Sequence, residues 1–177
     1  MAEDPPRRAY LSLGSNIDKE HNLARAVELL VERVSVASVS SVYETQPVGT
    51  TPQESFLNAA VLVETTMSPD DLKTQVLSPI EQELGRVRTA DRYGPRSIDV
   101  DIVLFDGEEI RTPLQVIPDP EIALRPHLAV PLAELAPDHV HPTTGETLRK
   151  IASSLKGKGG ISPRPDLDLR ALLQHKA

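Results

Sequence analysis

The residues of this chain whose types and spacing could do chemistry lie between positions 86 and 101. Four arginines precede a pair of aspartates in this stretch, which contains Arg86, Arg88, Arg92, Arg96, Asp99 and Asp101. Apolar residues alternate with the two acids and continue to Phe105, a pattern typical of a half-buried β-strand. Residues two apart in a strand point to the same face, so both carboxylates should project together, with Cα atoms roughly 6.5 Å apart.

This combination predicts a binding site for a divalent cation and for phosphate. Two convergent carboxylates can hold one hard cation or bridge two, and oxygen ligands suit Mg²⁺ rather than zinc. Arginine side chains offer forked donors to phosphate oxygens. Together these groups indicate chemistry on a magnesium nucleotide. A surface network of ion pairs is the alternative, but an acid on such a strand should be partly buried, where it needs a partner or a metal.

Three other groups could take part. Phe56 and Asn58 share a strand face, where Phe56 could stack on a flat ring and Asn58 could form hydrogen bonds with it. A core phenylalanine and a turn-capping asparagine are the alternative. His139 and His141 could bind a metal or simply lie in a proline-rich loop. The turn at residues 14–16, Gly-Ser-Asn, could bind phosphate or only connect a strand to a helix.

The composition of the chain narrows the class of protein. Its 177 residues suffice for one domain with a sizeable core, and its net charge of −7 argues against general nucleic-acid binding. The absence of cysteine excludes disulfides, thiolate metal sites and a cysteine nucleophile. Neither the P-loop motif nor the glycine-rich dinucleotide-binding motif is present. Because the N-terminus has no long apolar stretch, we expect a cytoplasmic protein without a signal peptide or a membrane span.

The helices and strands that must position these side chains can be inferred from the periodicity of the apolar residues. Strands are expected over residues 9–13, 34–43, 56–65 and 97–105, with helices over about residues 23–34 and 68–85. Ser68 is a favourable N-cap for the second helix, which Pro79 should kink or divide. The order β-α-β-β-α-β predicts an α+β, ferredoxin-like sandwich with an elaborated C-terminal third. In that third, frequent prolines leave room for little more than a short helix near residues 132–135.

The same patterns predict the domain organisation. Residues 1–8 should form a flexible lead-in, residues 9–155 a single domain, and residues 156–177 a linker and tail of unknown role. A glycine-rich joint at residues 157–160 marks the second boundary, and the apolar residues of 167–173 could form a final amphipathic turn.

Seven segments of the chain, taken together, resemble the 6-hydroxymethyl-7,8-dihydropterin pyrophosphokinase family. They are LSLGSN (11–16), SVYETQPVG (41–49), FLNAAV (56–61), IEQELGRVR (80–88), RYGPRSIDVDIVLF (92–105), VIPDP (116–120) and VPLAELAPD (130–138). They follow the family's order, and the resemblance covers roughly residues 9–152. The resemblance implies an Mg²⁺-dependent enzyme of folate biosynthesis. It would transfer diphosphate from ATP to the hydroxyl group of the pterin alcohol and release AMP.

The resemblance also implies roles for individual residues. Asp99 and Asp101 would hold two Mg²⁺ ions, and with Arg88 and Arg96 they would form the catalytic set. The ATP-binding residues would be Glu81, Arg88, Arg92, Tyr93, Arg96, Ile102 and Arg125. The pterin-binding residues would be Thr45, Val48, Phe56, Asn58 and His127.

Three positions depart from the family pattern. Asp119 stands where the family usually has histidine, His127 where the second stacking aromatic is commonly phenylalanine, and Ser78 where glutamine is frequent. Asp119 and His127 favour an alternative, a non-catalytic module that binds a magnesium nucleotide or a pterin. We expect the protein to be a monomer whose partners are small-molecule substrates. It should bind neither nucleic acid nor membranes. The tail after Gly157 could also join or associate with the next folate enzyme.

Overall fold

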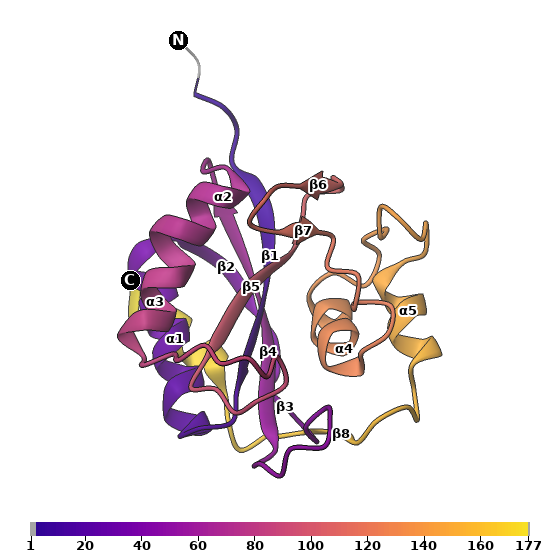
Figure 1. The fold of residues 1–177 in the computed structure, drawn as a ribbon. Coiled ribbons are helices and arrows are strands. Elements are labelled where there is room, and N and C mark those ends of the chain that lie inside the picture. Colours follow the sequence, from indigo (N-terminus) through magenta and orange to yellow (C-terminus); the bar gives the residue numbers. More distant parts are fainter. Residues whose placement is uncertain (1–2, 177) are drawn as a thin grey trace.

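A computed structural model describes residues 3–176 of the chain, whose elements are arranged around one antiparallel sheet (Figure 1). The strands of this sheet are β1 (Arg7–Ser15), β2 (Ser35–Val39), β3 (Tyr43–Thr45), β4 (Phe56–Thr65), β5 (Asp99–Phe105) and β8 (Ile161–Pro163). A separate ribbon consists of β6 (Ile110–Arg111) and β7 (Val116–Ile117). The α-helices are α1 (Lys19–Arg33), α2 (Pro69–Leu72), α3 (Ser78–Glu83), α4 (Pro126–Leu135) and α5 (Leu148–Ser154). A π-helical turn, η1 (Lys73–Leu77), and a 3₁₀ helix, η2 (Leu169–Lys176), complete the elements. None of the helices within residues 3–176 is long and apolar enough to cross a membrane.

The order of the strands confirms the ferredoxin-like fold. The sheet runs β5-β1-β4-β3-β8, β2 also pairs with β4, and every pair is antiparallel. With β2 and β3 taken as one interrupted strand, the chain follows the order β-α-β-β-α-β. The central strand β1 places Gly14 opposite Asn58 of β4 on one side and opposite Asp99 of β5 on the other. The end of β1 thus brings together two candidate site residues that are far apart in the sequence.

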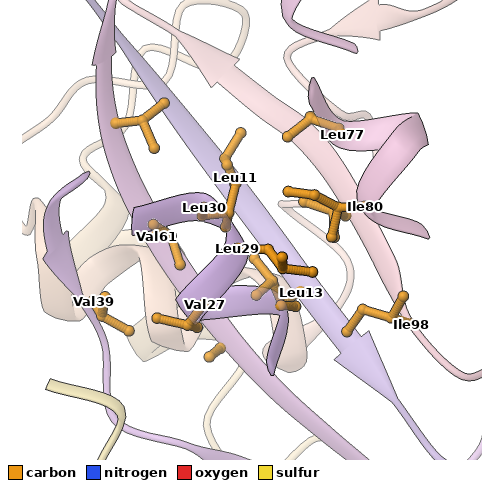
Figure 2. Close-up of a cluster of buried hydrophobic side chains, with 14 of the residues drawn as sticks. Leu11, Leu13, Val27, Leu29, Leu30, Val39, Val61, Leu77, Ile80 and Ile98 are labelled. Carbon is orange, nitrogen blue, oxygen red and sulfur yellow. The ribbon is translucent and has the colours of Figure 1, made fainter. Parts of the chain in front are cut away.

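Helices α1, α2 and α3 lie on one face of the sheet (Figure 1). The apolar residues of α1 recur every three or four positions, so that Leu23, Val27 and Leu30 are buried. They belong to one cluster with Leu11 and Leu13 of β1, part of which Figure 2 shows. This core fixes the helices behind the strands that carry the candidate site.

Helices α4 and α5 cover the other face of the sheet (Figure 1). Leu128 and Leu132 of α4 and Ile151 of α5 form a second buried cluster with Tyr10 and Val103 of the sheet. The central strands are therefore buried on both faces. This double burial explains why β4 is an almost continuous apolar run, FLNAAVLVET.

The helical stretch that follows Ser68 is interrupted, as Pro79 predicts. The Ser68 hydroxyl caps its start by accepting a hydrogen bond from the Asp71 backbone N–H at 3.1 Å. In the π-helical turn, the Ser78 N–H donates to the Lys73 carbonyl five residues earlier. Because proline has no N–H, Pro79 cannot donate to the preceding turn, and the regular α-helical pattern begins again with α3.

Three element boundaries differ from the expectation. Strand β1 begins inside the segment expected to be a flexible lead-in, because Arg7 Nε and the Arg8 N–H both donate to the Asp106 carboxylate, at 2.8 and 2.9 Å. The single strand expected over residues 34–43 is divided into β2 and the start of β3. Helix α4 has ten residues, longer than the short helix expected there, and accommodates Pro131 in its interior.

The segment after residue 155 is part of the fold and not the linker and tail that its glycines suggested. Strand β8 extends the sheet by pairing with β3, and the Arg164 N–H donates to the Val42 carbonyl at 2.8 Å. Leu169 of η2 is 5% exposed and belongs to the core cluster formed with α1, with Leu172 and Leu173 packed against it. The hydrophobic core therefore includes residues beyond the boundary expected from the sequence.

We expect Leu169→Ala to lower the free energy of unfolding by about 2–4 kcal/mol, because it removes a buried side chain from the core. Urea unfolding followed by circular dichroism measures this change. Leu114→Ala, at a leucine that is 51% exposed, is the matched control and should change stability by less than about 0.5 kcal/mol. Equal stability of the two variants would show that the C-terminal segment does not support the core.

Candidate active site

The ends of β1, β4 and β5 border a cavity of about 240 Å³. Most of the residues singled out in the sequence line it: Thr45, Val48, Phe56, Asn58, Arg92, Tyr93, Arg96, Asp99, Asp101, Arg125 and His127. Glu81, Arg88 and Ile102 do not line it. Segments that are widely separated in the sequence therefore meet at one place, on a surface formed by strand ends and loops.

Asp99 and Asp101 lie at the start of β5 and line the cavity, while the residues between and after them are buried. Asp99 accepts a hydrogen bond from Arg86 Nε at 2.9 Å and another from Arg96. The Asp101 carboxylate lies 3.7 Å from Nζ of Lys73, a residue that the sequence motifs did not indicate. Partial desolvation within the cavity, and then the charge of Asp99, raise the pKa of Asp101. The two acids form a close anionic pair that neighbouring cations hold in place.

This pair of carboxylates fits a magnesium site. Mg²⁺ is commonly bound by one or two protein carboxylates and completes its octahedral shell with water and substrate phosphates. Two oxygen ligands on one strand face, open to a cavity, provide that arrangement. In the part of the chain that the structure describes, no group of three or more His, Cys, Asp or Glu side chains is placed to hold a metal by itself. The phosphates of a nucleotide would therefore be part of the site.

His139 and His141 have a structural role. The Nδ1 atom of His141 accepts hydrogen bonds from the backbone N–H groups of Thr143 and Thr144, each at 3.2 Å. The ring of His139 packs against Tyr10, with ring centroids 5.2 Å apart. Burial lowers the pKa of both imidazoles. These contacts support the loop interpretation of the two histidines and not the metal site.

Arg96 is held where its loop meets the cavity. Its guanidinium pairs with Asp99, donates through Nε to the Gly94 carbonyl at 3.2 Å, and lies 5.5 Å from the centroid of the Phe56 ring. Its backbone N–H donates to Asn16 Oδ1 at 2.8 Å. These contacts orient a guanidinium between the proposed metal ligand and the proposed stacking ring.

Two further arginines of the cavity lie near Glu121. Arg92 Nη2 and Arg125 Nε are 3.6 and 3.8 Å from Glu121 Oε1. The Arg92 guanidinium also lies 4.9 Å from the centroid of the Tyr93 ring. Because the Arg92 side chain is 71% exposed, it can turn toward a phosphate without breaking a buried contact.

Asn58, Thr45 and Phe56 form the wall that the resemblance assigns to the pterin. Asn58 Nδ2 donates to Thr45 Oγ1 at 2.7 Å, which orients the amide. A Cβ atom at position 14 would lie 3.4 Å from Asn58 Oδ1, at the lower limit of ordinary contact. Glycine at this position therefore leaves room beside the amide, whose oxygen remains available to a ligand.

Asn16 is a residue of the site whose role sequence reasoning missed. Its side chain is buried and donates to Gln53 Oε1 at 2.8 Å and to the Glu54 carbonyl at 3.0 Å. Its Oδ1 atom accepts the Arg96 N–H, so one amide connects the loop before β4 to the loop that carries the arginines. Gln53 strengthens this connection by donating to the Tyr93 carbonyl at 2.6 Å. The Gly-Ser-Asn turn thus joins two loops, a role that its composition alone does not reveal.

Glu81, Arg88 and Ile102 lie outside the cavity wall, although the resemblance implied contact with ATP. The buried Glu81 carboxylate accepts the Val100 N–H and pairs with Arg88, both at 3.2 Å. Burial, followed by the charge of Asp101, raises the pKa of Glu81 to about 7. Ile102 is buried in the core on the opposite face of β5 from the two acids. Glu81 therefore supports the backbone of β5, and the Ile102 side chain is part of the core.

The cavity wall formed by the start of α4 and the loop before it contains the two residues that depart most from the family pattern. Asp119 Oδ1 accepts the Glu121 backbone N–H at 2.8 Å, and burial raises the pKa of Asp119. His127 lies in the first turn of α4, where burial lowers its pKa to about 4, opposed by Glu121 and assisted by Arg125. A neutral imidazole therefore lines the cavity near pH 7.

Known proteins that resemble this chain carry one recurring description. Residues 10–137 match the family model described as 7,8-dihydro-6-hydroxymethylpterin-pyrophosphokinase (HPPK). The 2-amino-4-hydroxy-6-hydroxymethyldihydropteridine pyrophosphokinase of Bacillus subtilis is 42% identical over 157 residues, covering 86% of this chain and 93% of that protein. A protein of the same name from Methylorubrum extorquens is 44% identical over 155 residues, covering 86% of this chain and 96% of that protein.

Larger proteins also contain a similar region. The crystal structure of wild-type HPPK-DHPS from Plasmodium falciparum has a TM-score of 0.65 to this chain at 15% identity. That similarity covers 86% of this chain and 45% of the other, and at this identity it shows the fold alone. The folic acid synthesis protein fol1 of Schizosaccharomyces pombe is 40% identical over 154 residues, which are 85% of this chain and 21% of that protein.

We expect His127 to contribute to a loss of stability as the pH falls from 6.5 to about 4. In the folded protein its imidazole stays neutral down to about pH 4, whereas in the unfolded chain it takes up a proton near pH 6.5. Protonation therefore favours the unfolded state across this window, and His127→Phe should lose less stability than the wild type. Urea titrations across the window measure the difference. The exposed His21 provides the control variant His21→Gln, which should follow the wild type. The same pH dependence in His127→Phe would contradict the assignment.

We expect Asn16→Ala to lower the free energy of unfolding by about 1–3 kcal/mol, because it leaves the Arg96 N–H and the Glu54 carbonyl without their partner. Hydrogen exchange followed by mass spectrometry should show faster exchange in both loops together. Thr51→Ala removes one exposed contact between the same loops, the 2.9 Å bond to Asp91, and should have a smaller effect. Faster exchange in only one loop would show that Asn16 does not connect them.

Proposed function

This chain belongs to the 7,8-dihydro-6-hydroxymethylpterin-pyrophosphokinase family, and we propose that it carries out the family reaction in the cavity at the ends of β1, β4 and β5. It is a diphosphotransferase of folate biosynthesis that moves diphosphate from ATP to the hydroxyl group of 6-hydroxymethyl-7,8-dihydropterin. One observation carries the proposed location. Asp99 and Asp101 share a single cavity with Arg92, Arg96 and the hydrogen-bonding amide of Asn58.

Asp99 and Asp101 would hold magnesium. Their oxygen atoms suit this ion, and their position on one strand face allows them to bridge a pair of ions, which is the number we propose. Bound Mg²⁺ supplies positive charge that polarises the phosphate oxygens and offsets the charge that develops during transfer. The carboxylates therefore fix where the polyphosphate lies relative to the rest of the cavity.

The arginines of the cavity bind the phosphate oxygens of ATP. Arg96 is paired with Asp99, and a cation on that carboxylate frees the guanidinium for a phosphate. Arg92, beside Tyr93, and Arg125 approach from the other side with only long contacts to Glu121. Arg88 is 66% exposed on the same loop as Arg92 and is tethered to the buried Glu81, so its contact with ATP requires the loop to move.

The pterin occupies the wall around Asn58. The Asn58 amide can accept and donate hydrogen bonds along one edge of the heterocycle, and Phe56 offers a face for stacking. Thr45 holds the amide in place, and Val48 adds apolar contact. His127 forms a second wall of the cavity as a neutral ring, which adds no charge beside an uncharged heterocycle.

The reaction requires positioned charges more than a reactive side chain. The pterin hydroxyl oxygen attacks the β-phosphorus of ATP and forms a new O–P bond. The bond between that phosphorus and the oxygen bridging to the α-phosphate breaks, AMP leaves with the bridging oxygen, and the hydroxyl proton passes to solvent. Phosphoryl transfer of this kind depends on alignment and on electrostatic stabilisation. Asp99, Asp101 and the arginines provide the stabilisation, while Asn58 and Phe56 provide the alignment.

We also propose that the protein acts as a monomer in the cytoplasm. The residues proposed to bind the metal, ATP and the pterin lie together on one chain, so the proposed reaction does not require a residue from a second copy, which supports the first point. The second point, a location in the cytoplasm, is supported by small-molecule substrates that include ATP. The alternative of a non-catalytic binding module has no support among the relatives, whose names describe enzymes.

Asp99→Asn and Asp101→Asn should each reduce pterin-dependent release of AMP by about 10²–10³-fold or more, because each removes a charge that holds the cation. Chromatography measures AMP formed from ATP and Mg²⁺ with and without 6-hydroxymethyl-7,8-dihydropterin. Asp138→Asn, at a carboxylate whose side chain is 86% exposed, should keep wild-type activity. Unfolding curves establish that the variants are folded. A fully active Asp99→Asn protein would remove this residue from the site, and AMP release independent of pterin would contradict the proposed transfer.

A further inference from the structure

Lys73 places a positive charge beside the cavity that neither the sequence motifs nor the proposed function uses. Its Nζ atom lies 3.7 Å from the Asp101 carboxylate, and its side chain is only 20% exposed. It is the first residue of η1, which packs against β5, the outermost strand of the sheet at that end. The lysine therefore reaches one of the two proposed metal ligands from the helices that lie beside this strand.

The π-helical turn explains why a lysine can occupy this position. Ile80 of α3 is fully buried, and in a regular α-helix the residue seven positions earlier, Lys73, would share its face toward the core. In η1 the Ser78 N–H bonds to the carbonyl five residues back, so the turn contains an extra residue. Leu72 consequently takes the core position at 0% exposure, and Lys73 is displaced toward β5.

The two carboxylates are neutralised from different directions. Asp99 receives two guanidinium groups, those of Arg86 and Arg96, from the arginine loop. Within residues 3–176, the ion pair that Asp101 forms is with Lys73. Asp101 also lies in the field of two other acids, Asp99 and Asp119, which repel it. An ammonium group and a divalent cation each relieve this repulsion, so they are alternatives at the same carboxylate.

We propose that Lys73 is an internal counter-ion of Asp101, which competes with the divalent cation and sets how tightly the nucleotide-free protein binds it. The inference rests on the proposed function, which makes Asp101 a metal ligand. Lys73 acts through Asp101 and not on a substrate, so it is a positioning residue. Its effect is a low affinity for the free cation, which favours entry of the cation with ATP, whose phosphates supply further oxygen ligands.

The test is the binding of Mn²⁺ alone to the full chain without ATP, followed by the electron paramagnetic resonance signal of free Mn²⁺. Lys73→Met keeps the length of the side chain and removes its charge. We expect the dissociation constant to fall about two- to fivefold, the effect of removing a partly exposed ion pair that the cation otherwise has to break. Lys73→Arg retains the charge and should restore the wild-type value, which loss of packing alone would not explain.

A second lysine provides the matched control. Lys150 pairs with Glu146 at 3.4 Å on the surface of α5, so Lys150→Met changes the net charge by the same amount without touching the cavity. Its Mn²⁺ affinity should equal that of the wild type. If Lys73→Met is unstable, Lys73→Gln provides the same test with a shorter polar side chain. An affinity for Mn²⁺ that is unchanged or weaker in the folded variant overturns the role of Lys73.

Asp101→Asn separates this inference from the proposed function. Mn²⁺ binding that is present in the wild type and lost in Asp101→Asn supports the metal site, whatever Lys73→Met does. With that site intact, an unaltered affinity in Lys73→Met removes only the counter-ion role. Absence of Mn²⁺ binding without ATP from the wild type and Lys73→Met alike overturns the counter-ion role. The metal site is then tested with a non-hydrolysable ATP analogue present, and Mn²⁺ binding that is equal in the wild type and Asp101→Asn would contradict it.

Discussion

The pairing register of β1 with its two neighbours is the constraint on which the rest of the site depends. Gly14 faces Asn58 across one ladder and Asp99 across the other, so the wall proposed to bind the pterin and the acidic pair meet at one strand end. A shift by one residue would turn the acids of β5 into the core. Leu11 and Leu13, both fully buried, oppose such a shift. Apolar packing on the face of the sheet that α1 covers thus fixes the positions of the proposed site residues on the opposite face.

The cavity contains its own counter-ions. Arg86 and Arg96 pair with Asp99, while Arg92 lies close to Glu121. In the proposed function, a metal would replace guanidinium groups at the acids, and phosphate would replace carboxylates at the arginines. Binding would then rearrange charges that the fold has already brought together, instead of removing new ones from water. This arrangement suits a reaction whose main requirement is a fixed electrostatic environment.

Local patterns in the sequence predicted much of the molecule. The alternation around Asp99 located β5 and the face of its acids, and Ser68 located the start of a helix. The position of Lys73 beside Asp101 could not be predicted, because a π-helical turn changes which residues of a helix face the core. Pro79 was the only residue in the sequence that indicated an interruption of this helix. The role of Asn16 depends on partners 37 and 80 positions away, which no local pattern reveals. The glycines before β8 suggested a linker, since they indicate a turn but not the strand that follows it.

The two edges of the sheet differ in what covers them. At one end β8 pairs with β3, while at the other end β5 is the outermost strand. Exposed strand edges can pair with other molecules, and charged side chains along them oppose this. Along the outer side of β5, the Glu81 carboxylate accepts the Val100 N–H at 3.2 Å and the Val103 carbonyl accepts the Asp119 N–H at 2.9 Å. A buried acid and a loop backbone therefore take the place of a further strand there, which protects this edge from pairing with another chain.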